Sequence, residues 1–323
     1  MQTSRSFFSS VFACLAFCRI ILPLNYNLKD VLLHVAWITS GFISSVVMVF
    51  NDVYILDLKH VNPRELSYIC SDIFGILMTT FPYPTMAYFV LKNDYMMRDK
   101  NLGKPKQFWL FLATVILQMI SLGLLLYTYA PGYKIHAAIC MIFVDFNLLI
   151  VETTTTLLIG ISTARFCKKV SELASDSDPL LILEQNVEVL IKAFTQLKQG
   201  AESVLFVTFG IETVYFIFLC YMVRMNQEMA PYVLFVVLKL TYVAFALENC
   251  YKNYKSLIRM LRKKLSVSDV SYQEEKRLLD LIYQVQEESP FTALGFFDVD
   301  RSTLTSILAT SATYIIILLQ FDQ

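Results

Sequence analysis

Five residues near the C-terminus of the chain share one face of a predicted helix. Their spacing of four, three, four and three residues places them on a single α-helical stripe. Hydroxyl groups line most of this stripe, which consists of Ser306, Thr310, Thr313, Ile317 and Gln320. Polar groups inside a bilayer are costly unless they face protein or water. The stripe therefore predicts either a close helix contact, which hydroxyl residues also favour, or the lining of a pore.

A second set of candidate residues carries charge or aromatic rings within otherwise apolar segments. Charged side chains in such segments usually pair with one another or line a water-filled cavity. Acids and aromatic faces around a cavity open to the outside would suit a small polar or cationic ligand. The alternative is that Lys239 only neutralises an acid inside the fold. The candidate ligand-binding residues are Tyr68, Asp72, Tyr127, His136, Asp145, Glu212, Tyr215, Tyr232 and Lys239, and Glu152 and Glu248 carry further charges in or near these segments.

The elements that must position these residues are long apolar segments. Hydrophobic residues make up 56% of the 323-residue chain, charged residues make up 17%, and the mean hydropathy is +0.54. A helix needs about 20 apolar residues to cross a bilayer. The sequence therefore predicts an all-α, multi-pass membrane protein, with spans at 31–50, 68–91, 108–130, 135–163, 201–223, 230–250 and 302–321.

Two long polar connections, 164–200 and 251–301, also show helical periodicity. Apolar residues recur at helical spacing in each, at Leu183, Val187, Leu190, Ile191 and Phe194 and at Leu278, Ile282 and Val285. We expect helices that pack outside the bilayer. The predicted organisation is an N-terminal cytosolic or re-entrant segment (1–30), a bundle of the first six spans with the connection 164–200 (31–250), cytosolic anchor helices (251–301) and the last span (302–323).

The distribution of lysine and arginine predicts the orientation of these spans, because both residues accumulate in cytoplasmic loops. With the N-terminus inside, the cytosolic segments hold 22 of the 27 basic residues and the outer loops hold four. This split predicts a cytoplasmic N-terminus and an extracellular C-terminus. A seven-helix G-protein-coupled receptor has the opposite orientation.

The first 24 residues contain an apolar stretch, Phe7 to Cys18, that follows Arg5 and is interrupted by Arg19. We expect an amphipathic or re-entrant helix there, with a secretory signal as the alternative. The seven cysteines are scattered and odd in number, and the three histidines are dispersed, so neither a disulfide framework nor a metal site or cofactor is expected. With a net charge of zero, nucleic acid is not an expected partner.

A motif occupies the last predicted span. Thr313 and Tyr314 are followed by five apolar residues and then by Gln320 and Phe321, and the segment 295–301 before the span reads Gly-Phe-Phe-Asp-Val-Asp-Arg. This pattern, including Gly295 and Phe296, resembles the insect-type gustatory receptor family, seven-transmembrane chemoreceptor ion channels related to insect odorant receptors. The chain is short for that family, and we expect compact outer loops or a shortened N-terminus.

The resemblance implies roles for the stripe. In this family and its odorant receptor relatives, four subunits surround a central pore lined by the last helix, and the positions of Ile317 and Gln320 form its outer constriction. A ring of four isoleucines can close by dewetting, and four glutamine amides can replace part of an ion's hydration shell. The family also places its ligand pocket in the outer half of the bundle.

The expected function is a ligand-gated, non-selective cation channel that detects a sugar or a bitter compound. Its expected partners are the tastant, permeating cations, membrane lipid and further subunits in a homo- or heterotetramer. One alternative is a seven-span receptor that signals through a cytosolic partner, which conflicts with the charge distribution. The other is a transporter, which would favour repeated halves that the sequence lacks. Enzymatic activity is not expected, because no convergent nucleophile or acid–base set is present.

Overall fold

The computed structural model describes residues 82–93, 135–175, 180–225, 230–267 and 271–321, with residues 135–150 as backbone only. It also describes eight single helical positions nearer the N-terminus: Val35, Thr39, Ile43, Val46, Ile73, Leu77, Ile116 and Ile120. Apart from these positions, the predicted segment 1–30 and the predicted spans 31–50 and 108–130 lie outside the described residues. The predicted span 68–91 is described mainly from Pro82 onward.

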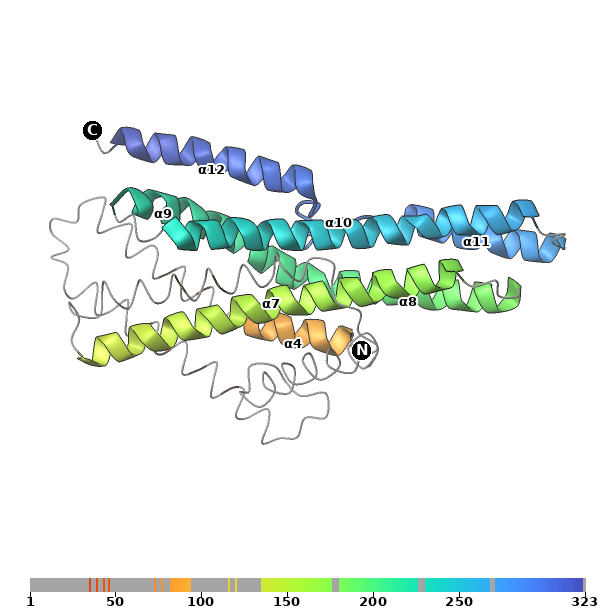
Figure 1. The fold of residues 1–323 in the computed structure, drawn as a ribbon, viewed down its shortest axis with the longest axis horizontal. Helices are drawn as coiled ribbons and strands as arrows, with labels where there is room; N and C mark the ends of the chain where they lie inside the picture. The colour runs from red at the N-terminus through yellow and green to blue at the C-terminus, as the bar shows by residue number, and fades with distance from the viewer. Residues whose placement is uncertain are drawn as a thin grey trace.

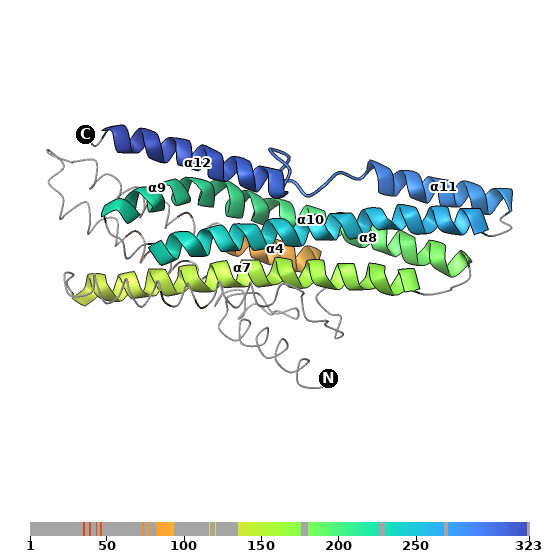
Figure 2. The same cartoon turned by 45° about the horizontal axis from the view of Figure 1, so that its top comes forward.

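The described chain is a set of long helices that lie side by side along the longest axis of the molecule (Figures 1 and 2). Helix α10 makes its most extensive contacts with α7, α11 folds back along α10, and α12 packs on α9 and α10. The elements are α4 (Pro82–Lys92), α7 (Ile135–Ser175), α8 (Leu180–Leu205), the π-helix η3 (Phe206–Ile211), α9 (Glu212–Met225), α10 (Ala230–Val267), α11 (Tyr272–Glu287) and α12 (Arg301–Phe321).

The lengths of these helices fit the predicted spans. Among the described residues, two stretches are long and apolar enough to cross a membrane, Leu181–Tyr221 and Ala230–Ser266. The predicted spans 135–163, 201–223, 230–250 and 302–321 are all helical. Helix α7 has 41 residues and is therefore about 60 Å long, roughly twice the thickness of the hydrocarbon core. It continues past the predicted span 135–163 into the first part of the predicted polar connection, as far as Ser175.

The two predicted polar connections contain the expected helices, which meet at one end of the molecule, here called the distal end. It comprises the C-terminal parts of α7 and α10, the N-terminal part of α8 and all of α11 (Figure 2). All the apolar residues whose spacing predicted these helices are buried, except Ile191, which is partly buried. An aromatic cluster joins the elements: the ring of Phe194 stacks on Tyr254 at 4.0 Å and meets Phe291 edge-on at 5.2 Å.

Helix α11 is fixed at both ends by polar contacts. Ser271 and Glu274 form a reciprocal capping box at its start, which satisfies amide groups that a helix N-terminus leaves free. At its other end, Lys255 of α10 donates hydrogen bonds of 2.8–2.9 Å to the carbonyls of Val285, Gln286 and Glu288. Burial of this ammonium group lowers the pKa of Lys255 below its usual value. The lysine thus holds the C-terminus of α11 against α10.

The contact between α7 and α10 depends on a glycine. A Cβ atom at Gly160 would overlap the hydroxyl oxygen of Tyr242, a buried α10 residue. We expect Gly160→Ala to force the two helices apart and to destabilise the protein by about 1–3 kcal/mol, the usual cost of overpacking. The measurement is the thermal midpoint of the purified protein in nanodiscs. Because Tyr242→Phe removes the nearest atom, the double variant should recover part of the loss; an unchanged midpoint for Gly160→Ala would contradict this account.

Candidate pore helix and buried ion-pair cluster

The segment that leads into α12 makes a tight turn at the glycine of the motif. Leu294 and Gly295 have positive φ angles of 50° and 77°, and an antiparallel bridge joins Thr292 to Asp298 around them. No atom lies within 4 Å of a Cβ built on Gly295, so its backbone conformation, rather than space, explains the glycine. Phe296 follows the turn, is 74% exposed and contacts the ring of Phe206, at the start of η3.

The start of α12 is fixed to the neighbouring helix α10. Asp300 Oδ1 accepts a hydrogen bond of 2.8 Å from the backbone N–H of Thr303, as an N-capping aspartate does. Arg301 Nε lies 2.8 Å from Glu248 Oε2, and its guanidinium lies 4.0 Å from the ring centre of Phe245. Helix α12 therefore begins at a defined point on α10, and its remaining length packs on α9 and α10.

Helix α12 has two different faces. Leu304 and Ser311 are buried, and Ile307 and Leu308 are partly buried against the core. None of the described helices covers the opposite face, and every residue of the predicted stripe lies on it: Ser306, Thr310, Thr313, Ile317 and Gln320 are all exposed. Tyr314 of the motif is also exposed, and Phe321 is described by its backbone alone.

A buried ion-pair cluster lies where α7, α9 and α10 meet. We define the cluster as Glu152, Glu212, Tyr232 and Lys239. The Lys239 ammonium pairs closely with Glu212 Oε1 and lies 3.5 Å from Glu152 Oε1, and these three side chains are only 1–3% exposed. Tyr232 donates a hydrogen bond of 3.5 Å to the same oxygen of Glu152. Tyr215 meets the Tyr232 ring edge-on at 6.0 Å.

The π-helix η3 immediately precedes Glu212. Its wider turn joins α8 to α9 without a break in the helical chain, and Val207, Thr208 and Phe209 within it are buried. A π-turn adds a residue relative to a regular α-helix, so it shifts the face on which all later residues lie. The π-helix thus sets the direction in which Glu212 meets Lys239. Single π-turns of this kind occur frequently at functional sites.

The structure brings together four of the nine predicted ligand-binding residues. Glu212 and Tyr215 of α9 and Tyr232 and Lys239 of α10 lie in or next to the cluster. Glu152 is the remaining member of the cluster. The sequence identified it as a charged residue within a predicted span but gave no indication of its partners. The backbone of α7 includes His136 and Asp145, whose side chains are not described, and Tyr68, Asp72 and Tyr127 lie outside the described residues.

A small cavity adjoins the cluster on the side of α4 and η3. It is lined by both glutamates and by Thr85, Thr155 and Thr208, together with aliphatic groups, and its volume of about 10 Å³ has room for roughly one water molecule. Pockets that hold drug-sized ligands measure about 300–1,000 Å³. This cavity is therefore far too small for a tastant, and the ligand-binding role of the cluster residues stays a prediction.

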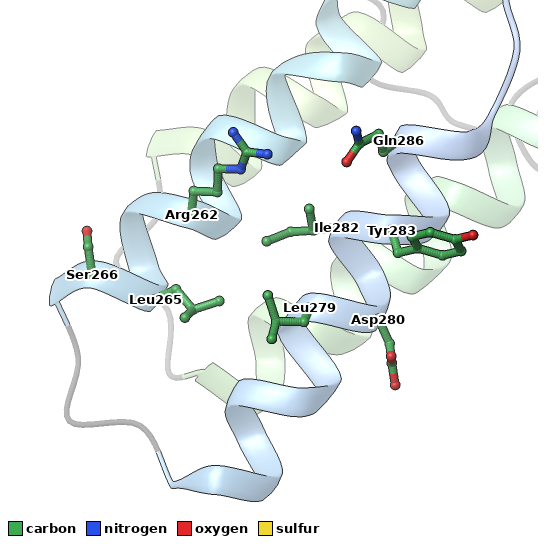
Figure 3. A pocket seen from close by; sticks show the side chains of 8 residues that line it. All are labelled: Arg262, Leu265, Ser266, Leu279, Asp280, Ile282, Tyr283 and Gln286. Atoms are coloured by element: carbon green, nitrogen blue, oxygen red, sulfur yellow. The ribbon is translucent and has the colours of Figure 1, made fainter.

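A larger groove lies at the distal end between α10 and α11. Figure 3 shows its two walls, with Arg262 and Leu265 on α10 facing Leu279, Ile282 and Gln286 on α11. Its volume is about 660 Å³, and it opens to the surface. Leu279 and Tyr283 on its α11 side are 51% and 61% exposed. The groove is separate from the ion-pair cluster, and apolar side chains of this size without cover suit a protein contact.

Long helices, a buried charge cluster and an exposed polar stripe are features that fit a multi-pass helical membrane protein. The family model described as 7tm chemosensory receptor matches residues 189–323, which contain η3, both helices of the groove and α12. Over these residues the chain is similar to the insect-type chemosensory receptor family. The resemblance inferred from the Thr-Tyr and Gln-Phe motif is thereby confirmed.

Individual relatives agree with this assignment. A 52-residue stretch is 42% identical to gustatory and pheromone receptor 32a of Drosophila melanogaster, and it covers 16% of this chain and only 11% of that receptor. The fold resembles the insect olfactory receptor OR5 from Machilis hrabei in complex with eugenol, with a TM-score of 0.73 and 14% identity over 98% of this chain and 99% of that chain. A second structure of the same receptor gives a TM-score of 0.70 with the same identity and coverage. At 14% sequence identity, this similarity shows a shared fold alone.

Proposed function

We propose that this protein is a gustatory-receptor-like, ligand-gated, non-selective cation channel of the plasma membrane. The observation that carries the proposal is the exposure of the whole α12 stripe, from Ser306 to Gln320, on the face that none of the described helices covers. Three hydroxyl residues and an amide in a membrane helix are costly against lipid but favourable against pore water. The resemblance to the chemosensory receptor family over residues 189–323 supports the pore over a simple helix contact.

The proposed assembly is a tetramer in which four α12 helices surround the pore. Residues 31–250 form the bundle of each subunit, residues 251–301 form the anchor helices, and residues 302–323 line the pore. The exposed apolar side chains of the α10/α11 groove support a second contact between subunits, at the distal end. With the N-terminus in the cytoplasm, this contact lies on the cytosolic side, and Gln320 lies near the outer surface.

The proposed ligand is a small tastant, a sugar or a bitter compound, held in the outer half of the bundle. Tyr215 and Tyr232 supply aromatic faces beside the ion-pair cluster, and the predicted residues of α7 and of the first three spans would complete the site. Ligand binding would shift the closed-to-open equilibrium through a difference in affinity between the two states. The Machilis hrabei receptor with a similar fold has a small organic ligand, eugenol, in its structure.

The test is whole-cell recording from cells that express this chain alone, with G-protein signalling blocked and a panel of sugars and bitter compounds applied. We expect a rapid, ligand-evoked current carried by both sodium and potassium, with a reversal potential near zero. Surface expression is checked with an epitope placed after Gln323, which should be labelled from outside without permeabilisation. A labelled C-terminus without current under any ligand, alone or with co-expressed receptors of the family, would contradict the channel proposal.

A further inference from the structure

The segment that joins α11 to α12 (Figure 2) contains a serine followed by a proline. Ser289 and Pro290 form the one Ser-Pro pair of the full sequence, which contains no Thr-Pro pair. Proline restricts the residue before it to extended backbone. Glu288, which ends α11, is extended as well, with φ of −64° and ψ of 126°, and residues 288–291 belong to no helix or strand. The chain around Ser289 is therefore extended.

The side chain of Ser289 is exposed and contacts a cation of α8. Its hydroxyl oxygen accepts a hydrogen bond of 2.5 Å from Lys198 Nζ. The same ammonium group lies 2.9 Å from Glu288 Oε1, and the side chains of Lys198 and Glu288 are 13% and 21% exposed. Ser289 does not line the α10/α11 groove. The hydroxyl group is therefore open to a reagent in solution and lies within hydrogen-bond distance of a positive charge.

Two side chains of α10 hold the backbone just before this serine. Lys255 Nζ donates a hydrogen bond of 2.9 Å to the carbonyl of Glu288, and the hydroxyl of Tyr251 donates one of 3.2 Å to the same carbonyl. Ammonium groups from α8 and α10 thus contact Ser289 and the residue before it. A phosphate group is stabilised where positively charged donors are already in place. This segment therefore offers both an acceptor hydroxyl and counter-charges for a phosphate.

We propose that Ser289 is a phosphorylation site for a proline-directed serine/threonine kinase, and that Lys198 binds the resulting phosphate. Ser289 Oγ forms a bond to the γ-phosphorus of ATP, the bond from that phosphorus to ADP breaks, and the hydroxyl proton passes to the catalytic base of the kinase. The phosphate adds a charge of about −1.5 to −2 beside Lys198, where it competes with the carboxylate of Glu288. The proposal rests on the cytosolic location of residues 251–301, which the epitope after Gln323 tests separately, and does not depend on channel activity.

The first test asks whether a kinase of this class modifies the serine. Permeabilised membranes that contain the full-length chain, with both faces accessible, are incubated with ATP and a purified mitogen-activated protein kinase, and mass spectrometry locates the phosphate. We expect phosphate on Ser289, absent from Ser289→Ala and Pro290→Ala and retained in Ser289→Thr. The matched control is Ser256→Ala, because Ser256 is exposed on α10 but is followed by leucine, and it should keep the phosphate. An unmodified Ser289, or a phosphate that persists in Pro290→Ala, would overturn the assignment.

A second measurement tests the role of Lys198. A phosphate that is bound to its ammonium group should be protected from alkaline phosphatase. Lys198→Met should therefore accept as much phosphate as the unaltered protein but lose it about tenfold faster, since a charge-assisted hydrogen bond no longer holds it. Lys192→Met, which changes an exposed lysine of the same helix, should lose its phosphate at the unaltered rate. Equal rates of removal in Lys198→Met and the unaltered protein would show that Lys198 does not bind the phosphate.

Discussion

Replacing Lys239 by methionine is expected to prevent the protein from reaching the cell surface. Methionine fills a similar volume, but the change leaves Glu152 and Glu212 facing each other in a site that is closed to water. Removing one partner from a buried ion pair typically costs about 3–5 kcal/mol, because the remaining charge is left uncompensated. That amount is a large share of the total stability of a typical domain. We expect strong loss of surface labelling and a much lower thermal midpoint.

A control and a rescue distinguish this charge effect from simple loss of a side chain. Lys252→Met changes a lysine of the same helix that pairs with Glu248 on the surface, where its side chain is 64% exposed, and it should change little. The triple variant Lys239→Met, Glu152→Gln, Glu212→Gln is neutral throughout the cluster and should recover most of the surface labelling. If Lys239→Met alone behaves like the unaltered protein, the cluster is not held by its charges.

The helices of this fold could be predicted because the apolar length and periodicity that indicate them are properties of each segment's own sequence. Apolar length gave the spans that correspond to α7, α9, α10 and α12, and helical periodicity placed Leu183 and Leu278 on buried faces. The stripe on α12 was readable for the same reason, since five residues at helical spacing share a face in any α-helix. The stripe residues are exposed in the structure, and whether they contact another helix or line a pore stays a prediction.

The partners of the charged residues could not be predicted, because they depend on packing between helices far apart in the sequence. The sequence identifies Glu152 and Glu212 only as charged residues within predicted spans. The residues around them in the sequence do not indicate that Lys239 pairs with both. The π-helix was equally hidden, since its sequence Phe-Val-Thr-Phe-Gly-Ile is compatible with a regular α-helix. The same holds for two polar contacts between helices. Lys255 donates a hydrogen bond to the end of α11 and Arg301 pairs with Glu248 only once the helices are packed.

Truncating the proposed gate is expected to open the channel without ligand. Ile317 lies on the uncovered face of α12, 40% exposed, between Thr313 and Gln320. Four isoleucines around a narrow axis would exclude water, and alanine in their place widens and wets the constriction. We expect Ile317→Ala to raise ligand-independent current about tenfold, which corresponds to a shift of roughly 1.4 kcal/mol in the closed-to-open equilibrium.

The neighbouring isoleucine provides a matched control for this effect. Ile316→Ala removes the same atoms from a residue that is 57% exposed but lies off the stripe, so basal current should stay unchanged. Gln320→Ala should change the relative permeability of sodium and potassium, because it removes the amides that would contact a partly dehydrated ion. Whole-cell recording with normalised surface expression measures all three variants. Alanine at a lipid-facing position would leave both the current and the ion selectivity unaltered. If Ile317→Ala and Gln320→Ala both behave in this way, the stripe lies outside the pore.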